Sequence, residues 1–301
     1  MNSFRLFLRL SRPLPILGGV LTFALGAGVA RYLGASIDWG IYLLGQTWVI
    51  LLQLSAHYLG DYFAHPADQA NAPRTPFSER SDALWSGKLP RQLVFWAGVS
   101  CLSVLASLTV LLISNVGFSP SIILMMGVIS LVALSYSIPP LRLASSGYGE
   151  LLMSILITNL VPALAYLLQA GEWHRLLPMA TFPLLLLHLG MLMAFEFPDY
   201  AADVKYEKNT LLVRIGWRHG MQMHNLLILG GFILLGVAWA LGLPDQIALP
   251  ALLVVMIGAY HVWVMTRIEA GARPNWLLFT VAAAAIFGLT AYLLAYGFWT
   301  R

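Results

Sequence analysis

Charged residues are scarce in this chain, and their scarcity limits what the protein can be. Asp, Glu, Lys and Arg make up 10% of the 301 residues, 59% are hydrophobic, and the mean hydropathy is +0.78. An ordinary soluble domain has about 25% charged residues. The composition therefore excludes a soluble globular protein and predicts an integral membrane protein.

Cysteine and long polar segments are also lacking. Cys101 is the single cysteine, so no intrachain disulfide can form. Neither a low-complexity linker nor a long charged tail separates the apolar segments, so we interpret residues 1–301 as one membrane domain. The net charge of +4 needs no nucleic-acid partner, because the distribution of the charges along the chain explains it.

Long apolar segments are present in abundance. A transmembrane helix needs about 20 apolar residues, and segments of that length predict an all-α, polytopic protein with about nine helices. They begin near Pro15, Gly40, Gln92, Ser119, Gly147, Arg175, Met221, Pro244 and Asn275.

The Lys and Arg residues support this topology. Cytoplasmic loops concentrate these residues, and with the N-terminus inside, all but three of the 17 fall on that side. A cleavable signal peptide over residues 1–30 is an alternative, but removing that segment would spoil the alternation. The three exceptions are Arg31, Arg175 and Arg301.

The segment from Phe195 to Gly216 carries the strongest functional signal. Asp199 and Asp203 are spaced i and i+4, so they lie on one helical face and can share a hard divalent cation. Lys205 and Lys208 suit the phosphate oxygens that such a cation would bridge. The pattern predicts metal–diphosphate chemistry at the bilayer surface, with a local Asp–Lys network as the alternative.

A second polar insertion, residues 60–92, falls on the same predicted side. His57, Asp61 and His65 have helical spacing, but Pro66 disfavours helix at His65 and predicts a kink before Asp68.

A third piece, Ser135 to Glu150, joins two spans on that side. Pro139 and Pro140 stop the helix, Arg142 supplies a cation, and Tyr136 lies one turn inside the membrane edge.

Three stretches carry motifs in a fixed order along the chain. They read LSRPLPILGGVL, YSIPPLRLASSGYGELL and PDYAADVKYEKNTLLVRIG. Together they resemble the UbiA superfamily of membrane prenyltransferases, and especially its quinone-pathway branch, which includes the dihydroxynaphthoate enzymes. Glu207 stands where the family commonly has glycine. The residues that match the second acidic motif are Asp199, Asp203, Lys208, Thr210, Arg214 and Gly216.

The first acidic motif departs from the family pattern, which is Asn-Asp-x-x-Asp-x-x-x-Asp, often followed by a further Asn. The residues at these places are Gly60, Asp61, Ala64, Asp68 and Asn71. The initial Asn and the middle Asp of the pattern are missing here. The resemblance implies that residues at those two positions hold magnesium and diphosphate in the family. It therefore implies one intact and one degenerate half-site.

The resemblance implies a Mg²⁺-dependent transfer of a polyprenyl group from its diphosphate to an aromatic quinone precursor. The reaction is expected in a central cavity among the helices, with a ring such as Tyr136 facing the allylic cation. The resemblance also implies a catalytic and metal-binding set of Asp199, Asp203, Asp61 and Asp68. It implies substrate contacts from Lys208, Arg142, Lys205, Lys88, Arg74, Asn71, Tyr136 and Arg12.

We expect the chain to be integral to a bacterial inner membrane, with the N-terminus and the site loops cytoplasmic. Gly60 and Ala64 keep an alternative open. In it, a catalytically impaired relative binds a lipid or quinone, or serves as a structural subunit of a larger membrane complex. A small-molecule transporter is a weaker third candidate, because the acids lie at one surface and not near the midplane.

Overall fold

The computed structural model describes residues 10–65, 67, 75, 77, 89–117 and 119–301, and within them the regular elements are helices. Nine spans of the described chain are long and apolar enough to cross a membrane. The predicted all-α polytopic fold is confirmed, and each span begins within about one helical turn of its predicted start. The spans are α2 (Pro13–Tyr32), α3 (Trp39–Tyr62), α6 (Arg91–Val116), α7 (Pro120–Ser137), α8 to α9 (Gly149–Ala170), α10 (Leu176–Glu196), α13 (Trp217–Ala240), α14 to α15 (Asp245–Glu269) and α16 (Trp276–Thr300).

Two of these spans are interrupted near prolines. Pro162 has no backbone N–H, and its ring would clash with the carbonyl four residues back. A single π-turn, η2, precedes it and accommodates the missing bond. In the other interrupted span, Pro250 lies near the end of its first helix, α14. The pieces are α8 (Gly149–Ile155), η2 (Leu156–Leu160), α9 (Val161–Ala170), α14 (Asp245–Leu252) and α15 (Val255–Glu269).

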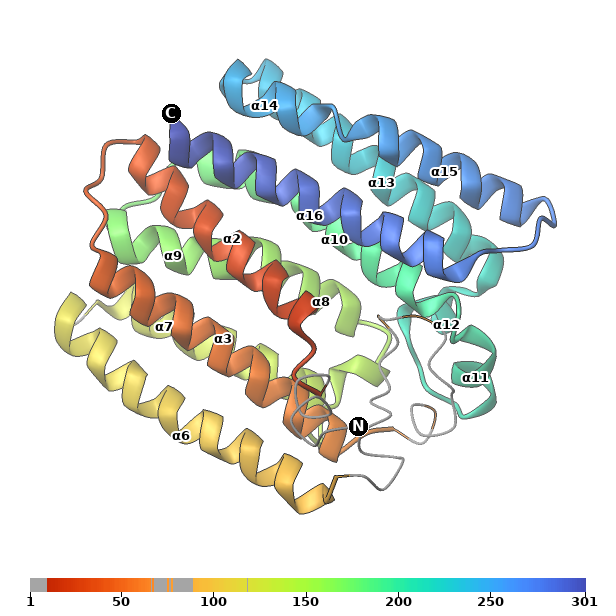
Figure 1. Ribbon diagram of the computed structural model, residues 1–301, viewed down its shortest axis with the longest axis horizontal. Coiled ribbons are helices and arrows are strands. Elements are labelled where there is room, and N and C mark those ends of the chain that lie inside the picture. The colour runs from red at the N-terminus through yellow and green to blue at the C-terminus, as the bar shows by residue number, and fades with distance from the viewer. Residues whose placement is uncertain (1–9, 66, 68–74, 76, 78–88, 118) are drawn as a thin grey trace.

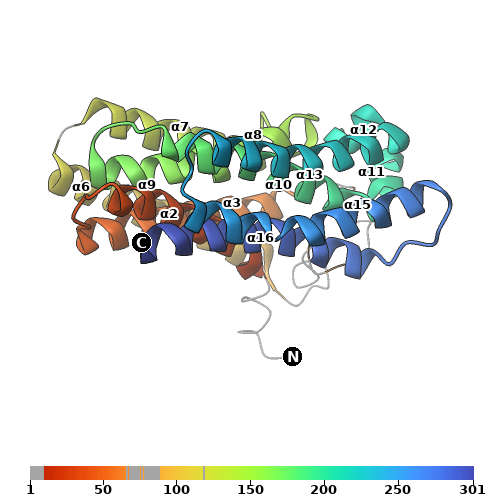
Figure 2. The same ribbon diagram turned by 90° about the horizontal axis from the view of Figure 1, so that it is seen from above.

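The helices form a bundle in which α2 packs against α3, α9 and α16, while α10 packs against α13 and α16. Helix α3 also packs against α6 and α7. Seen from above, α2, α3 and α16 lie in one layer and α7, α9 and α10 in another (Figure 2). The start of α2, the end of α3, the start of α8 and two short helices, α11 (Tyr200–Lys205) and α12 (Leu211–Ile215), gather at one end of the bundle, and the C-terminus lies at the opposite end (Figure 1).

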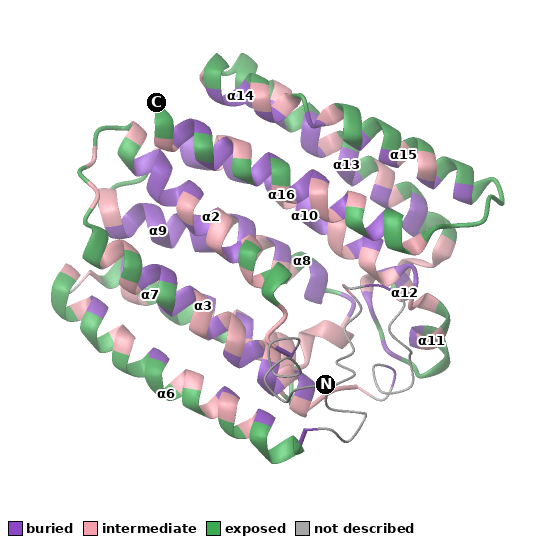
Figure 3. Ribbon diagram, viewed as in Figure 1, coloured by how far each residue is buried: buried purple, intermediate pink, exposed green. Residues whose placement is uncertain are grey.

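Close helix contact depends on small residues, as expected where lipid weakens the hydrophobic drive between helices. A Cβ added at Gly26 in α2 would lie 2.0 Å from the carbonyl oxygen of Pro162 in α9, so only glycine allows this approach. Val110 in α6 and Leu226 in α13 are exposed apolar residues, and exposed positions recur along α6 and α15 (Figure 3). Exposed apolar residues suit contact with lipid.

Candidate functional site at one end of the bundle

The second acidic motif begins at the end of α10 and continues through α11. The amide of Asp203 donates to the carbonyl oxygen of Asp199 (3.0 Å), so the two residues are separated by one helical turn. The amide of Lys208 donates to the carbonyl oxygen of Asp203 (2.9 Å). The side chains of Asp203 and Lys208 are both buried, each with 3% exposure. The structure thus brings the motif's acids and one of its lysines together.

The other lysine of this motif lies differently. Lys205 is exposed, and its ammonium group lies 5.3 Å from the centre of the ring of Tyr206. A solvated lysine over a neighbouring ring needs no ligand to account for its place. Lys208 is therefore the better placed of the two for diphosphate.

The middle segment lies directly beside this motif. Ser146 and Asn209 form an isolated parallel bridge, and Tyr136 lies in the last turn of α7. Arg142 has a left-handed backbone (φ 40°) and is half-buried, and its Nε is buried without a hydrogen-bond partner in the described chain. A guanidinium group with an unused buried donor is suited to an anion.

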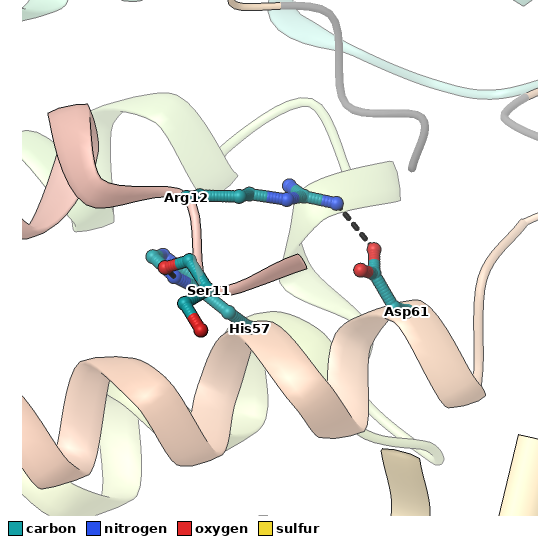
Figure 4. A network of polar contacts seen from close by, with 4 residues as sticks. All are labelled: Ser11, Arg12, His57 and Asp61. Carbon is teal, nitrogen blue, oxygen red and sulfur yellow. Dashed lines mark hydrogen bonds and ion pairs between the residues drawn. The ribbon is translucent and has the colours of Figure 1, made fainter. Parts of the chain in front are cut away.

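The first acidic motif contributes Asp61 from the last turn of α3. This side chain is buried, with 4% exposure, and forms an ion pair with Arg12 (Figure 4). Arg12 precedes α2 in a left-handed conformation (φ 48°), and its side chain points along the bundle end toward Asp61. Two bonds from Ser11 hold this turn: its hydroxyl shares a 2.7 Å hydrogen bond with Tyr58, and its carbonyl accepts from Nδ1 of His57 (3.3 Å).

Helix α3 ends at Tyr62, as the proline at position 66 predicts. His65 is therefore not on the helical face of Asp61, and its Nδ1 accepts from the amide of Ala67 (3.2 Å). Phe77, also from this insertion, stacks on Phe195 with the ring centroids 4.4 Å apart, so the two insertions meet. Asp68, Asn71, Arg74 and Lys88, which the sequence also predicts as site residues, lie outside the described residues.

Two glutamates were given no role by the sequence analysis. Oε1 of Glu150 accepts from the amide of Leu211 (3.2 Å), and Oε2 of Glu196 accepts from the amide of Leu212 (3.0 Å). Thr210, the N-cap residue, accepts from the next amide, that of Val213 (3.3 Å). We call Glu150, Glu196 and Thr210 the α12 cap. A threonine before an apolar run signals the cap locally, but no sequence rule pairs it with distant glutamates.

The donor set fits a hydrated hard cation. Carboxylates one turn apart are suitable ligands for magnesium, which keeps several waters and shares substrate phosphates. Within the described residues, no group of three or more His, Cys, Asp or Glu side chains could hold a metal ion by itself. A cation at Asp199 and Asp203 would therefore take water or substrate oxygens as its remaining ligands.

Comparisons with known proteins bear on the family and the fold of the chain. The sequence profile of the UbiA prenyltransferase family matches residues 20–283. No curated protein sequence is significantly similar to the chain.

Several solved structures share the fold at low sequence identity. A UbiA homolog from Archaeoglobus fulgidus bound to GPP and Mg²⁺ is 16% identical, with a TM-score of 0.64 over 96% of this chain and 99% of that one. A digeranylgeranylglyceryl phosphate synthase is 16% identical, with a TM-score of 0.63 over 99% and 98%. The apo UbiA homolog from Aeropyrum pernix K1 is 15% identical, with a TM-score of 0.63 over 94% and 96%. At such identities these likenesses establish the fold.

Proposed function

Because the chain belongs to the UbiA prenyltransferase family, we propose that it transfers a polyprenyl group from a prenyl diphosphate to an aromatic quinone precursor. The observation that carries the proposal is the placement of Asp199 and Asp203 one turn apart, with Lys208 buried beside Asp203. The Archaeoglobus fulgidus homolog has been solved with Mg²⁺ and with GPP or DMAPP, which supports the same substrate class here.

In the proposed reaction Asp199 and Asp203 are the residues that would hold Mg²⁺. The bound ion would stabilise the charge that develops on the leaving diphosphate. Lys208 and Arg142 contact the diphosphate oxygens directly, because both are cations placed on segments that adjoin the acids.

The remaining residues shape the reaction space. Apolar side chains of the spans exclude water from the allylic cation, and the ring of Tyr136 faces it. We place the reaction in a central cavity that opens at the end of the bundle carrying α11 and α12, with that end cytoplasmic. The allylic carbon–oxygen bond breaks, diphosphate leaves with the bonding electron pair, and the acceptor attacks the allylic carbon and loses a proton to solvent.

The degenerate half-site keeps a role in this proposal. Asp61 contributes one carboxylate, and its ion pair with Arg12 brings a further cation to the same end of the bundle. Asp68, Asn71, Arg74 and Lys88 remain proposed contributors from outside the described residues. Apart from Gly60 and Ala64 in the first acidic motif, no feature of the described chain favours the alternative of a non-catalytic subunit.

A transfer assay tests the proposal. The purified chain, in detergent with Mg²⁺, receives a labelled polyprenyl diphosphate and a panel of dihydroxynaphthoate-like and hydroxybenzoate-like acceptors. We expect a prenylated product from the wild-type chain and none above background from Asp199→Ala. Failure with every acceptor, in protein that still binds the isoprenoid, would remove the enzyme assignment.

A further inference from the structure

We propose that Glu150 and Glu196 are positioning residues for the prenyl-diphosphate site. In this account they hold α12 against the ends of two membrane spans and so keep Lys208 buried next to Asp203. The inference rests on the proposed function, since Lys208 is assigned there to the diphosphate. It assigns a positioning role to two carboxylates that the proposed function leaves without one.

Three consecutive amides at the start of α12 are bound by three side chains of different origin. Thr210 is local, whereas Glu150 reaches Leu211 from α8 and Glu196 reaches Leu212 from the end of α10. A single N-cap side chain is the ordinary way to begin a helix. Charged acceptors make stronger hydrogen bonds to amides than neutral ones, so the two additional bonds fix α12 to the membrane domain.

The sequence around Glu150 is built to place this carboxylate. A Cβ added at Gly149 would lie 2.3 Å from the carbonyl oxygen of Leu143, so a larger residue would push the start of α8 away. Gly147 adopts φ +73°, and a Cβ there would meet the side chain of Arg214 at 2.9 Å. Arg214 in turn lies over the ring of Tyr148, 4.2 Å from its centre. The Gly-Tyr-Gly-Glu stretch thus joins α8 to α12.

The connection from the α12 cap to Lys208 is short and made by the backbone. Asn209 bridges to Ser146, and the amide of Thr210 donates to the carbonyl oxygen of Lys208 (3.0 Å). On its other side, Lys208 donates its amide to Asp203. Lys208 therefore lies between two anchors, the turn after α11 and the α12 cap. Loss of the second anchor would free the lysine to leave its buried position for solvent.

The test is a double-variant cycle with two readouts. Glu150→Ala and Glu150→Gln are each made in the wild-type and Lys208→Ala backgrounds, because glutamine keeps an acceptor oxygen while alanine removes it. Glu207→Asn is the matched control, since it removes an exposed carboxylate from the same segment and asparagine tolerates the positive φ of that position. The readouts are KM and kcat for a prenyl diphosphate, and hydrogen exchange of the peptide that contains Leu211 and Leu212.

We expect Glu150→Ala to raise KM roughly 10-fold with little change in kcat, as loss of a charged hydrogen bond would. The same change in the Lys208→Ala background should raise KM less than twofold, and Glu150→Gln should recover most of the wild-type KM. Exchange at the α12 peptide should rise in Glu150→Ala, while peptides from α2 and α16 and the Glu207→Asn control stay unchanged.

Two results would overturn the inference. One is an equal rise in KM in both backgrounds, which would mean that Glu150 acts independently of Lys208. The other is unchanged exchange at the α12 peptide in Glu150→Ala. If the wild-type chain binds no prenyl diphosphate, the proposed function fails and the positioning role with it, whereas the exchange result still reports whether the α12 cap exists.

Discussion

The two acidic regions at the site end of the bundle are held in different ways. In the second region, Asp203 and Lys208 are buried on a segment joined to α8 and α10 through the α12 cap. In the first, the described carboxylate belongs to Asp61, which binds the guanidinium group of Arg12. The first region therefore already pairs its carboxylate with a protein cation, whereas the second is the region that we propose for the metal.

The largest expected effect is a difference in activity between variants of Asp203 and of Asp61. We expect Asp203→Asn to lower kcat/KM for prenyl transfer about 100- to 1,000-fold, the scale on which loss of one transition-state contact is felt. The factor by which Asp61→Asn lowers kcat/KM should be at least about tenfold smaller than the factor for Asp203→Asn. Steady-state rates at saturating Mg²⁺ measure both. Equal losses would mean that Asp61 contributes as much to the reaction as Asp203, and would contradict the proposed difference between the two regions.

The next prediction compares KM for variants of the buried Lys208 and the exposed Lys205. Lys208→Ala should raise KM for the prenyl diphosphate about 10- to 100-fold, because a charged hydrogen bond contributes roughly 1.5–3 kcal/mol. Lys205→Ala, its matched control, should change KM less than about twofold, since that ammonium is exposed over Tyr206. A larger effect at Lys205 would contradict our reading of the second region.

A pair of glycines tests how the second region is anchored. Gly149→Ala places a Cβ against the carbonyl of Leu143 and should lower unfolding stability by about 1–3 kcal/mol. Gly127→Ala, on the open face of α7 where nothing lies within 4 Å, should be neutral or stabilising by up to about 1 kcal/mol. Denaturant unfolding in detergent micelles compares them, and similar midpoints would argue against close packing at the start of α8.

The smallest expected effect concerns the ion pair of the first region. A double-mutant cycle on Arg12 and Asp61 should give a coupling of about 1–3 kcal/mol, because Asp61 is buried. The exposed pair of Arg218 and Glu269, 4.0 Å apart, should couple by less than about 1 kcal/mol. Unfolding free energies of the four variants in each cycle supply the numbers. No excess coupling at Arg12 and Asp61 would mean that the pair is incidental.

Much of this architecture could be predicted from sequence, because membrane spans are long runs of one chemical type. Hydropathy and charge placement predicted the nine spans, and Pro66 predicted that α3 would end before His65. The i, i+4 spacing predicted that Asp199 and Asp203 would be one turn apart. Each of these signals is local in the chain.

The unpredicted features depend on tertiary contacts. Glu150 and Leu211 are brought together by folding, and no periodicity relates positions so far apart. The family motif favours Lys208 over Lys205, but only the folded chain shows that Lys208 is buried while Lys205 is exposed. The pairing of Arg12 with Asp61 likewise depends on how α2 enters the bundle.

Calorimetric binding of a prenyl thiolodiphosphate that resists ionisation, with and without Mg²⁺, tests whether Asp199 and Asp203 hold the metal. It compares the wild-type chain with Asp199→Ala. We predict that Mg²⁺ tightens binding to the wild-type chain by at least about tenfold, and that Asp199→Ala abolishes this dependence while the protein stays folded. Binding that is independent of Mg²⁺, or that Asp199→Ala leaves unchanged, would contradict the assignment of the metal to Asp199 and Asp203.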